Sequence, residues 1–223
     1  MKPFTLPSNP DPTTLARHID GLRQTLRAVN LEQLALRTGA SFETGQVGTG
    51  RFILKLWGQE ILIAIPEWIA RDLDNGKELP IVSQGLLLYY FQTADGAPID
   101  PRWISFSELP DGRFYNQAYQ GYTGNELGRA FANDLDRFQT AGERLGGLCQ
   151  EAPAQAPGDA AYLFQVLPRI SILVAYWRGD EDFPASAQVI FQASTPHYLP
   201  TDVCAILGST LTRRLIAVKN NPL

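Results

Sequence analysis

Residues 167–184, which read LPRISILVAYWRGDEDFP, join the most apolar run of the chain to its densest cluster of acids. Branched and aromatic side chains dominate residues 170–177, as is typical of a strand. The polar residues 178–180 then predict a turn, and residues 187–193 form a second apolar run. This stretch therefore predicts a β-hairpin with the acids at its turn, and residues 162–166 predict a strand directly before it.

A similar order of elements occurs earlier in the chain. Residues 52–57 and 60–65 predict a hairpin that turns at Gly58-Gln59, because glycine supplies the positive φ that tight hairpin turns require. In both places a hairpin is followed by Leu-Pro and an apolar helix, over residues 50–92 and residues 161–218. We therefore expect an α+β fold in which antiparallel hairpins pack with helices. The order suggests a pseudo-twofold repeat of hairpin plus helix, although convergent patterning would produce it equally.

The remaining segments predict further helices and strands. Residues 11–39 predict a helical N-terminus that ends at Gly39, because apolar side chains recur there at spacings of three and four. Residues 102–146 predict short strands followed by one long helix, which a capping box at residues 123–126 would start. Residues 151–158, EAPAQAPG, form the only segment that resembles a linker.

The composition argues against nucleic-acid and membrane partners. The 19 Lys and Arg and 23 Asp and Glu give a formal net charge of −4, and no basic run could neutralise several phosphates. No apolar stretch approaches the roughly 18 residues that cross a bilayer, and MKPFTLPSNPDP lacks the apolar core of a signal peptide. Cys149 and Cys204 form no CxxC pair, and a disulfide framework in a chain this long would use more cysteines. We expect one soluble, cytoplasmic domain over residues 1–223.

The acids at the predicted turn are the first candidates for a functional site. They are Asp180, Glu181 and Asp182. Three roles are open: a solvated turn, an anchor that accepts backbone N–H bonds or pairs with Arg169 or Arg178, and a metal or acid–base site. Phe183-Pro184 favours the anchor, because an apolar residue and a proline suggest that the chain packs back and draws one carboxylate inward.

Aromatic side chains are the second group of candidates. Trp103 and Trp177, with Tyr89 and Tyr90, could line a pocket for a flat ligand, or they could simply fill the core. No metal site is expected, and the residues identify neither a catalytic group nor a cofactor. The candidate ligand-binding residues are Trp103, Arg169, Trp177, Asp180, Glu181 and Asp182.

Three stretches of the chain resemble a known family. They are LLLYYFQTADGAPIDPRWISFSELPDGRFY, the Gly146-Gly147 pair, and GDAAYLFQVLPRISILVAYWRGDEDFPASAQVIFQAS. They are similar to the uncharacterised bacterial and archaeal domain of unknown function 3786, over roughly residues 31–215. The most specific part is Trp177 with residues 179–184, although Asp182 and Gln192 stand where the family pattern often has Glu and Asp.

The resemblance implies a setting rather than an activity. Some members of the family carry a fused four-cysteine iron–sulfur segment of the corrinoid-protein type, which implies a corrinoid-related partner protein. Two isolated cysteines cannot hold such a cluster by themselves. We therefore hypothesise a cytoplasmic protein that binds a small ligand or a tetrapyrrole-type cofactor, or that assists a cofactor-dependent partner. The alternatives are an enzyme that uses a carboxylate of residues 180–182 and a protein–protein interaction module.

Overall fold

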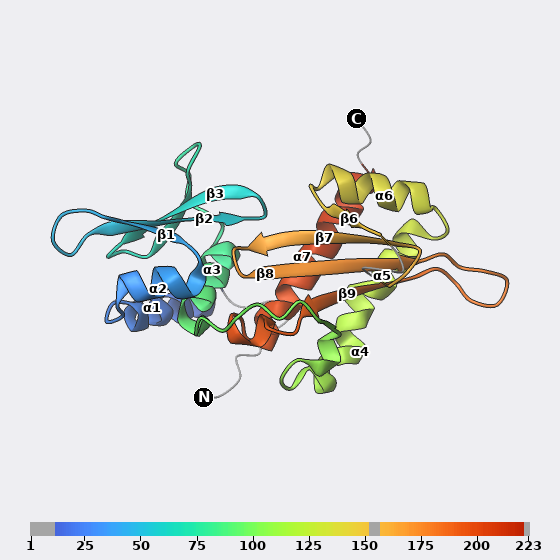
Figure 1. Cartoon of the computed structure of the whole chain (residues 1–223), viewed down its shortest axis with the longest axis horizontal. Helices are drawn as coiled ribbons and strands as arrows, with labels where there is room; N and C mark the ends of the chain where they lie inside the picture. The colour runs from blue at the N-terminus through green and yellow to red at the C-terminus, as the bar shows by residue number, and fades with distance from the viewer. Residues whose placement is uncertain (1–11, 152–156, 221–223) are drawn as a thin grey trace. The chain divides into compact units, whose positions relative to one another are not determined.

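The computed structural model describes residues 12–151 and 157–220 and has an α+β fold with two antiparallel sheets (Figure 1). The chain divides into two compact units. The described residues of the first unit are 12–99, 166–170 and 194–203, and those of the second are 100–151, 157–165, 171–193 and 204–220. The α+β prediction is confirmed, whereas the single domain and the pseudo-twofold repeat stay predictions. Residue 11, the expected start of the N-terminal helix, and residues 152–156 of the expected linker lie outside the described residues.

The first unit contains a four-stranded sheet in the order β1-β2-β3-β4. Its strands are β1 (Ser41–Thr44), β2 (Gly50–Leu56), β3 (Gln59–Ile65) and β4 (Ile69–Asp72). The predicted hairpin is present as β2–β3, with Leu56 opposite Gln59. Its turn is Trp57-Gly58, one residue before the expected position. Both turn residues have positive φ, 53° and 82°, as a type I′ turn requires.

Three helices accompany this sheet, namely α1 (Pro12–Leu26), α2 (Leu31–Thr38) and α3 (Ile81–Thr93). α3 contacts α1, α2 and β4, and seven of its 13 residues are buried, which explains why it is apolar on most sides. α2 begins at Asn30, whose side chain accepts a hydrogen bond from the backbone N–H of Gln33. It ends at Gly39 in the left-handed conformation that favours glycine. Local capping therefore sets both ends of α2.

The second unit contains a five-stranded sheet in the order β5-β9-β8-β7-β6. Its strands are β5 (Trp103–Ile104), β6 (Leu148–Gln150), β7 (Ala160–Leu167), β8 (Ile170–Trp177) and β9 (Ser186–Gln192). The predicted second hairpin is present as β8–β9, with Trp177 opposite Ser186. β8 is buried along almost its whole length, as expected for the central strand of a sheet with covered faces.

The helices α4 (Gly112–Tyr122), α5 (Gly124–Phe131), α6 (Leu135–Arg144) and α7 (Thr201–Asn220) belong wholly or mainly to the second unit. The expectation of one long helix after residue 122 is wrong. The chain breaks between α5 and α6 at Ala132, which has a φ of 47°. Asp134 then starts α6 by accepting a hydrogen bond from the backbone N–H of Arg137.

Two further local predictions in this region are wrong. The capping box expected at Thr123 and Glu126 is not formed, because the Thr123 hydroxyl donates instead to the carbonyl of Tyr119. A capping box forms earlier, between Ser105 and Glu108, and starts the 3-10 helix η1 (Phe106–Glu108). The short strand expected after residue 112 is the helix α4. Competing side-chain hydrogen bonds therefore decide where these elements begin.

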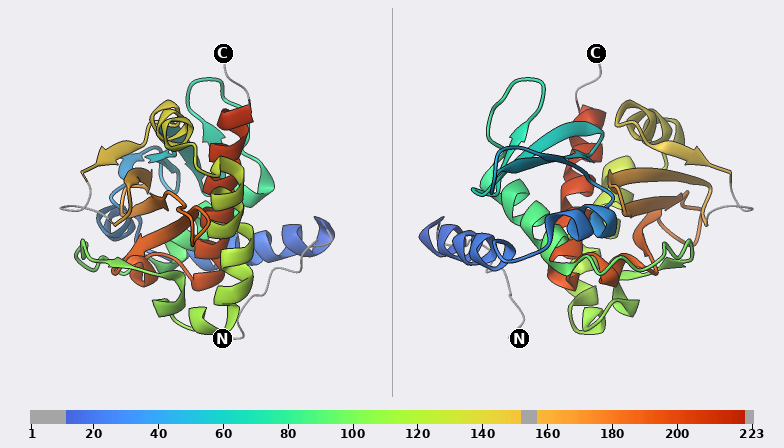
Figure 2. Two further views of the ribbon diagram at one scale, coloured as in Figure 1. Left: turned by 90° about the vertical axis from the view of Figure 1, so that its right-hand side faces the viewer. Right: turned by 60° about the vertical axis from the view of Figure 1, so that its left-hand side comes forward.

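α7 runs beside α4 and α5 in the second unit (Figure 2). A Cβ at Gly208 would lie 2.3 Å from the hydroxyl oxygen of Tyr119, so only glycine allows this approach of α7 to α4. Near the other end of α7, the ammonium of Lys219 donates to the carbonyl of Ala130. None of the helices in the described residues is long and apolar enough to cross a membrane.

Candidate functional site

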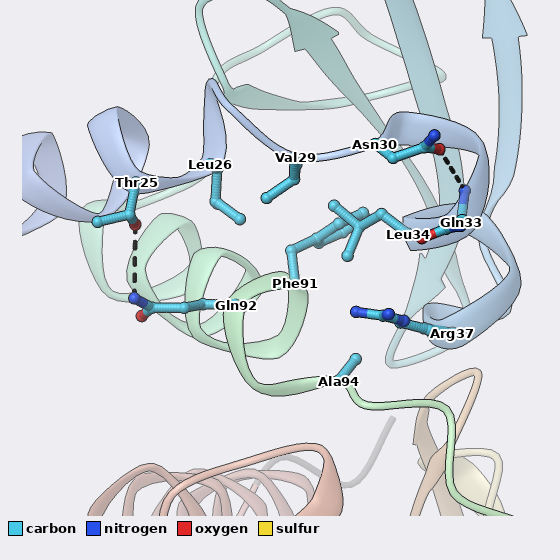
Figure 3. Close-up of a pocket in the computed structure, with 10 residues that line it drawn as sticks. All are labelled: Thr25, Leu26, Val29, Asn30, Gln33, Leu34, Arg37, Phe91, Gln92 and Ala94. Atoms are coloured by element: carbon cyan, nitrogen blue, oxygen red, sulfur yellow. Dashed lines mark hydrogen bonds between the residues drawn. The ribbon is translucent and has the colours of Figure 1, made fainter.

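An open pocket of about 430 Å³ lies between α1, α2 and α3 in the first unit (Figure 3). We call it the α1–α2–α3 pocket. Its lining consists of Thr25, Leu26, Val29, Asn30, Gln33, Leu34, Arg37, Phe91, Gln92 and Ala94. Its volume is within the range of roughly 300–1,000 Å³ that is typical of small-molecule sites.

The floor of the pocket is apolar and belongs to the core of the first unit. Leu26, Leu34 and Phe91 are each 5% exposed or less. The Phe91 ring packs against Phe52 and Trp68, with centroids 4.8 and 5.6 Å apart. Because these aromatic contacts hold the ring in place, the floor is a preformed apolar surface.

Uncharged polar groups surround this floor. The Asn30 side-chain oxygen accepts the 2.9 Å hydrogen bond that caps α2, and the Gln92 amide donates to the Thr25 hydroxyl at 3.4 Å (Figure 3). The amide of Gln33 is exposed beside them. The rim therefore offers amide donors and acceptors above an apolar floor, which is the usual composition of a ligand pocket.

Arg37 provides the only charge in the lining. It lies in the last turn of α2, and its guanidinium points into the pocket (Figure 3). Its stem packs on Gly96, where a Cβ would lie 3.1 Å from Arg37 Cγ. No carboxylate among the described residues forms an ion pair with it. The pocket therefore contains a positive charge whose donors are available to a ligand.

The candidate residue Arg169 lies in the first unit and holds α2 in place. Its guanidinium donates to the carbonyl of Leu36 at 3.5 Å, so the cation lies at the negative end of the helix dipole. Its backbone N–H donates at 3.1 Å to the hydroxyl of Tyr90, which in turn donates to the carbonyl of Thr38 at 2.5 Å. Burial raises the pKa of Tyr90 well above its ordinary value. Arg169 and Tyr90 therefore fasten the end of the helix that carries Arg37.

The candidate tryptophans lie together in the second unit. Trp103 and Trp177 are half-buried and pack, with Leu163, against one cluster of small and aliphatic side chains. The cluster consists of Ala161, Leu173, Ala175 and Ile190. Tyr89 and Tyr90 belong to the first unit. The two tryptophans thus cover an apolar patch of the second sheet, which is the packing role that the sequence left open.

The three acids lie in the exposed loop between β8 and β9. Asp180 holds this loop, because its carboxylate accepts the backbone N–H groups of Asp182 and Phe183 at 2.9 and 2.8 Å. Glu181 and Asp182 are exposed. Phe183, which suggested that the chain packs back here and draws a carboxylate inward, is 72% exposed, and all three acids are exposed as well.

Among the described residues, neither Arg169 nor Arg178 forms an ion pair with these acids. Arg178 instead faces Asp159, whose carboxylate accepts its backbone N–H at 2.7 Å and lies 3.7 Å from its Nε. Among the residues that the structure describes, no group of three or more His, Cys, Asp or Glu could hold a metal ion. The acid cluster therefore shapes a loop and presents two carboxylates to solvent.

Three titratable residues interact in the first unit, namely His18 on α1, Tyr89 on α3 and Asp202 at the start of α7. His18 Nε2 is hydrogen-bonded to the hydroxyl of Tyr89. Burial raises the pKa of Asp202, while the N–H of Val203 and the nearby His18 act in the opposite direction. Burial and the charge of Asp202 raise the pKa of Tyr89 to about 12.

Sequence reasoning missed the α1–α2–α3 pocket. Gly39 indicates where α2 ends, and this places Arg37 in the last turn of the helix. No signal in the sequence places Phe91 beside that arginine, because the four strands of the first sheet separate α3 from α2 in the chain.

A protein-family model matches residues 30–214, and this family is described as a domain of unknown function (DUF3786). No curated protein matches the chain. No solved structure matches it either. The comparisons therefore assign a family and leave the activity to be argued from the site.

Proposed function

The chain belongs to the DUF3786 family, and we propose that it binds a small ligand in the α1–α2–α3 pocket. The observation that supports this function is the guanidinium of Arg37, which points into the pocket without an ion-pair partner among the described residues. Specific ligand sites combine an apolar wall with a few oriented polar groups. Leu26, Leu34 and Phe91 would bury the apolar part of the ligand, and the rim amides would orient its polar part.

The lining favours a small organic molecule over a metal-bearing tetrapyrrole. Such cofactors are commonly held by an axial His, Cys, Met or Tyr, and none of these types lines the pocket. An accessory role beside a corrinoid-related partner protein and a cytoplasmic location remain proposals that derive from the resemblance and the composition. A tagged chain that retains no corrinoid protein from the source cells would argue against the partner, and fractionation of those cells would test the location.

The enzyme alternative has less support. A carboxylate that acts as an acid or base usually lies in a cleft, whereas Asp180, Glu181 and Asp182 are exposed. We therefore propose no reaction for them.

One observation favours the interaction alternative. α4 exposes Phe114, Tyr115 and Tyr122, which are 84%, 50% and 38% exposed, and exposed aromatic groups often mark contact surfaces. Retention of a specific partner by the wild-type chain, and its loss in Phe114→Ser, would support a contact role. Equal retention by both proteins would reject it.

Binding in the pocket is tested by amide chemical shifts recorded with a library of small aromatic and aliphatic fragments. We expect some fragments to shift the amides of residues 30–37 and 91–94. Val29→Trp should abolish these shifts, because Val29 lines the pocket and a large ring would fill it. The matched control is Leu36→Trp, which adds the same ring on α2 at a side chain that is 76% exposed and outside the lining. Equal shifts in both variants, or no fragment that acts at the pocket, would reject the proposal.

A further inference from the structure

Given the pocket function proposed above, we propose that Arg37 selects ligands that carry a planar carboxylate on an apolar body. The lining contains no Asp or Glu, so one positive charge faces a set of neutral groups. A guanidinium presents its N–H donors in a planar fork that matches the two oxygens of a carboxylate. The free charge of Arg37 and its shape therefore indicate the same class of ligand.

Contacts around the end of α2 position the stem of Arg37 before a ligand binds. Gly96, with a φ of 86°, lets the chain pass close to the stem of Arg37, because a Cβ at this position would lie only 3.1 Å from Arg37 Cγ. Tyr90 and Arg169 fasten the carbonyls at the end of the same helix. Because these contacts hold the helix end and the base of the Arg37 side chain, less entropy is lost when the ligand forms its hydrogen bonds.

The helix ends around the pocket favour a single negative charge over a phosphate dianion. Thr25 and Leu26 are the last residues of α1, and Ala94 is the C-cap of α3. Carbonyl groups at helix C-termini carry partial negative charge, which opposes any anion but opposes a dianion about twice as strongly as a monoanion. One arginine balances one carboxylate, whereas phosphate sites usually combine a cation with a free helix N-terminus or further cations. At the start of α2, the N–H of Gln33 is already bonded to Asn30.

The ligand body is expected to be short and apolar. Leu34 and Phe91 form a floor beside the arginine in a space of about 430 Å³. An aromatic or branched aliphatic monocarboxylate would place its chain on this floor and its charge against Arg37. The exposed amide of Gln33, one turn before Arg37 on α2, could donate to the second carboxylate oxygen.

Three small probes test this selection, namely benzoate, benzamide and phenyl phosphate. Their binding to the full chain is measured by amide shifts of residues 30–37 at low salt. Benzoate should bind about tenfold or more tightly than its neutral isostere benzamide, which corresponds to one charge-assisted hydrogen-bonded pair. It should also bind more tightly than phenyl phosphate.

Variants separate a local effect from a change in net charge. Arg37→Gln should bring benzoate down to the affinity of benzamide, and Arg37→Lys should keep part of the preference. Arg27→Gln removes one positive charge from an exposed site outside the lining and should keep the full preference.

The outcomes also distinguish small-ligand binding in the pocket from carboxylate selection by Arg37. Equal binding of benzoate and benzamide in the wild type would overturn carboxylate selection and leave small-ligand binding standing. Tighter binding of phenyl phosphate would overturn the carboxylate in favour of a phosphate. If none of the probes and no library fragment shifts the pocket amides, both proposals are wrong.

Discussion

The phenol of Tyr90 donates a 2.5 Å hydrogen bond to the carbonyl of Thr38, the last residue of α2. The same hydroxyl accepts the backbone N–H of Arg169 from the turn between β7 and β8. Tyr90 and Arg169 lie in two of the stretches that resemble DUF3786, LLLYYF and LPRI. One buried hydroxyl therefore joins both stretches to the helix that carries Arg37.

Replacing Tyr90 with Phe tests this anchor. The change leaves the Thr38 carbonyl without its phenol donor, and we expect the free energy of unfolding to fall by about 1–3 kcal/mol. Urea denaturation measures the loss. The control Tyr115→Phe removes the hydroxyl of a half-exposed tyrosine on α4 and should change stability by less than about 0.5 kcal/mol. An equal effect of the two substitutions would contradict an anchoring role for Tyr90.

Gly96 tests how Arg37 is positioned. Gly96 and Gly76 have positive φ values, 86° and 69°, so an alanine at either site should cost roughly 1–2 kcal/mol of backbone strain. Only at Gly96 would the new Cβ press on Arg37, because nothing lies within 4 Å of a Cβ at Gly76. Gly96→Ala should therefore shift the Nε–H resonance of Arg37, and Gly76→Ala should leave it in place. An unshifted resonance in Gly96→Ala would show that Gly96 does not position the side chain.

Asp202 should make stability depend on pH. Burial raises the pKa of Asp202, so the folded state binds its proton more tightly than the unfolded chain does. The contribution of this carboxyl to the free energy of unfolding is therefore most favourable when it is protonated. It declines as the pH rises from about 4, the ordinary value of an aspartate, through the raised pKa. Asp202→Asn should gain stability relative to the wild type across this window, as measured by urea denaturation at several pH values. A difference between the two proteins that is independent of pH would contradict the raised pKa.

Asp95 is a control for Asp202, because its pKa is shifted in the opposite direction. Hydrogen bonds from the His197 ring and from the N–H of Ala97 lower its pKa. The stability that it contributes is present above the ordinary aspartate pKa and is lost as the pH falls through the lowered pKa. The deficit of Asp95→Asn relative to the wild type should therefore shrink as the pH falls.

The loop between β8 and β9 tests the role of the acids. Asp180→Ala removes the acceptor of two backbone N–H bonds and should destabilise the loop, with a loss of about 0.5–1.5 kcal/mol. The neighbouring substitution Glu181→Ala should be nearly neutral, because this side chain is exposed. Faster hydrogen exchange at Phe183 in the first variant alone would support the anchor, and equal exchange in both would reject it.

Much of the fold could be predicted because its signals are local. The β2–β3 and β8–β9 hairpins follow from apolar runs separated by glycine-containing turns, and the end of α2 follows from Gly39. The division of the expected long helix could not be predicted in this way. Ala132 adopts a positive φ there, which alanine rarely adopts and which its residue type does not indicate.

The site was less predictable than the fold because it depends on long-range packing. The sequence suggests Arg169 as a partner of the acids, yet its guanidinium binds the carbonyl of Leu36, 133 residues away in the sequence. Arg37 reads as one more polar residue on an amphipathic helix. It becomes a candidate binding residue only when Phe91 lies beside it and no carboxylate of the described residues pairs with it.

A crystal structure of the full chain soaked with benzoate tests the central claim most directly. We predict density for benzoate in the α1–α2–α3 pocket, with its ring on Phe91 and its carboxylate within hydrogen-bonding distance of the Arg37 guanidinium. An empty pocket at a benzoate concentration that saturates the chain in solution, or benzoate bound only elsewhere, would contradict the binding of carboxylates by Arg37 in this pocket.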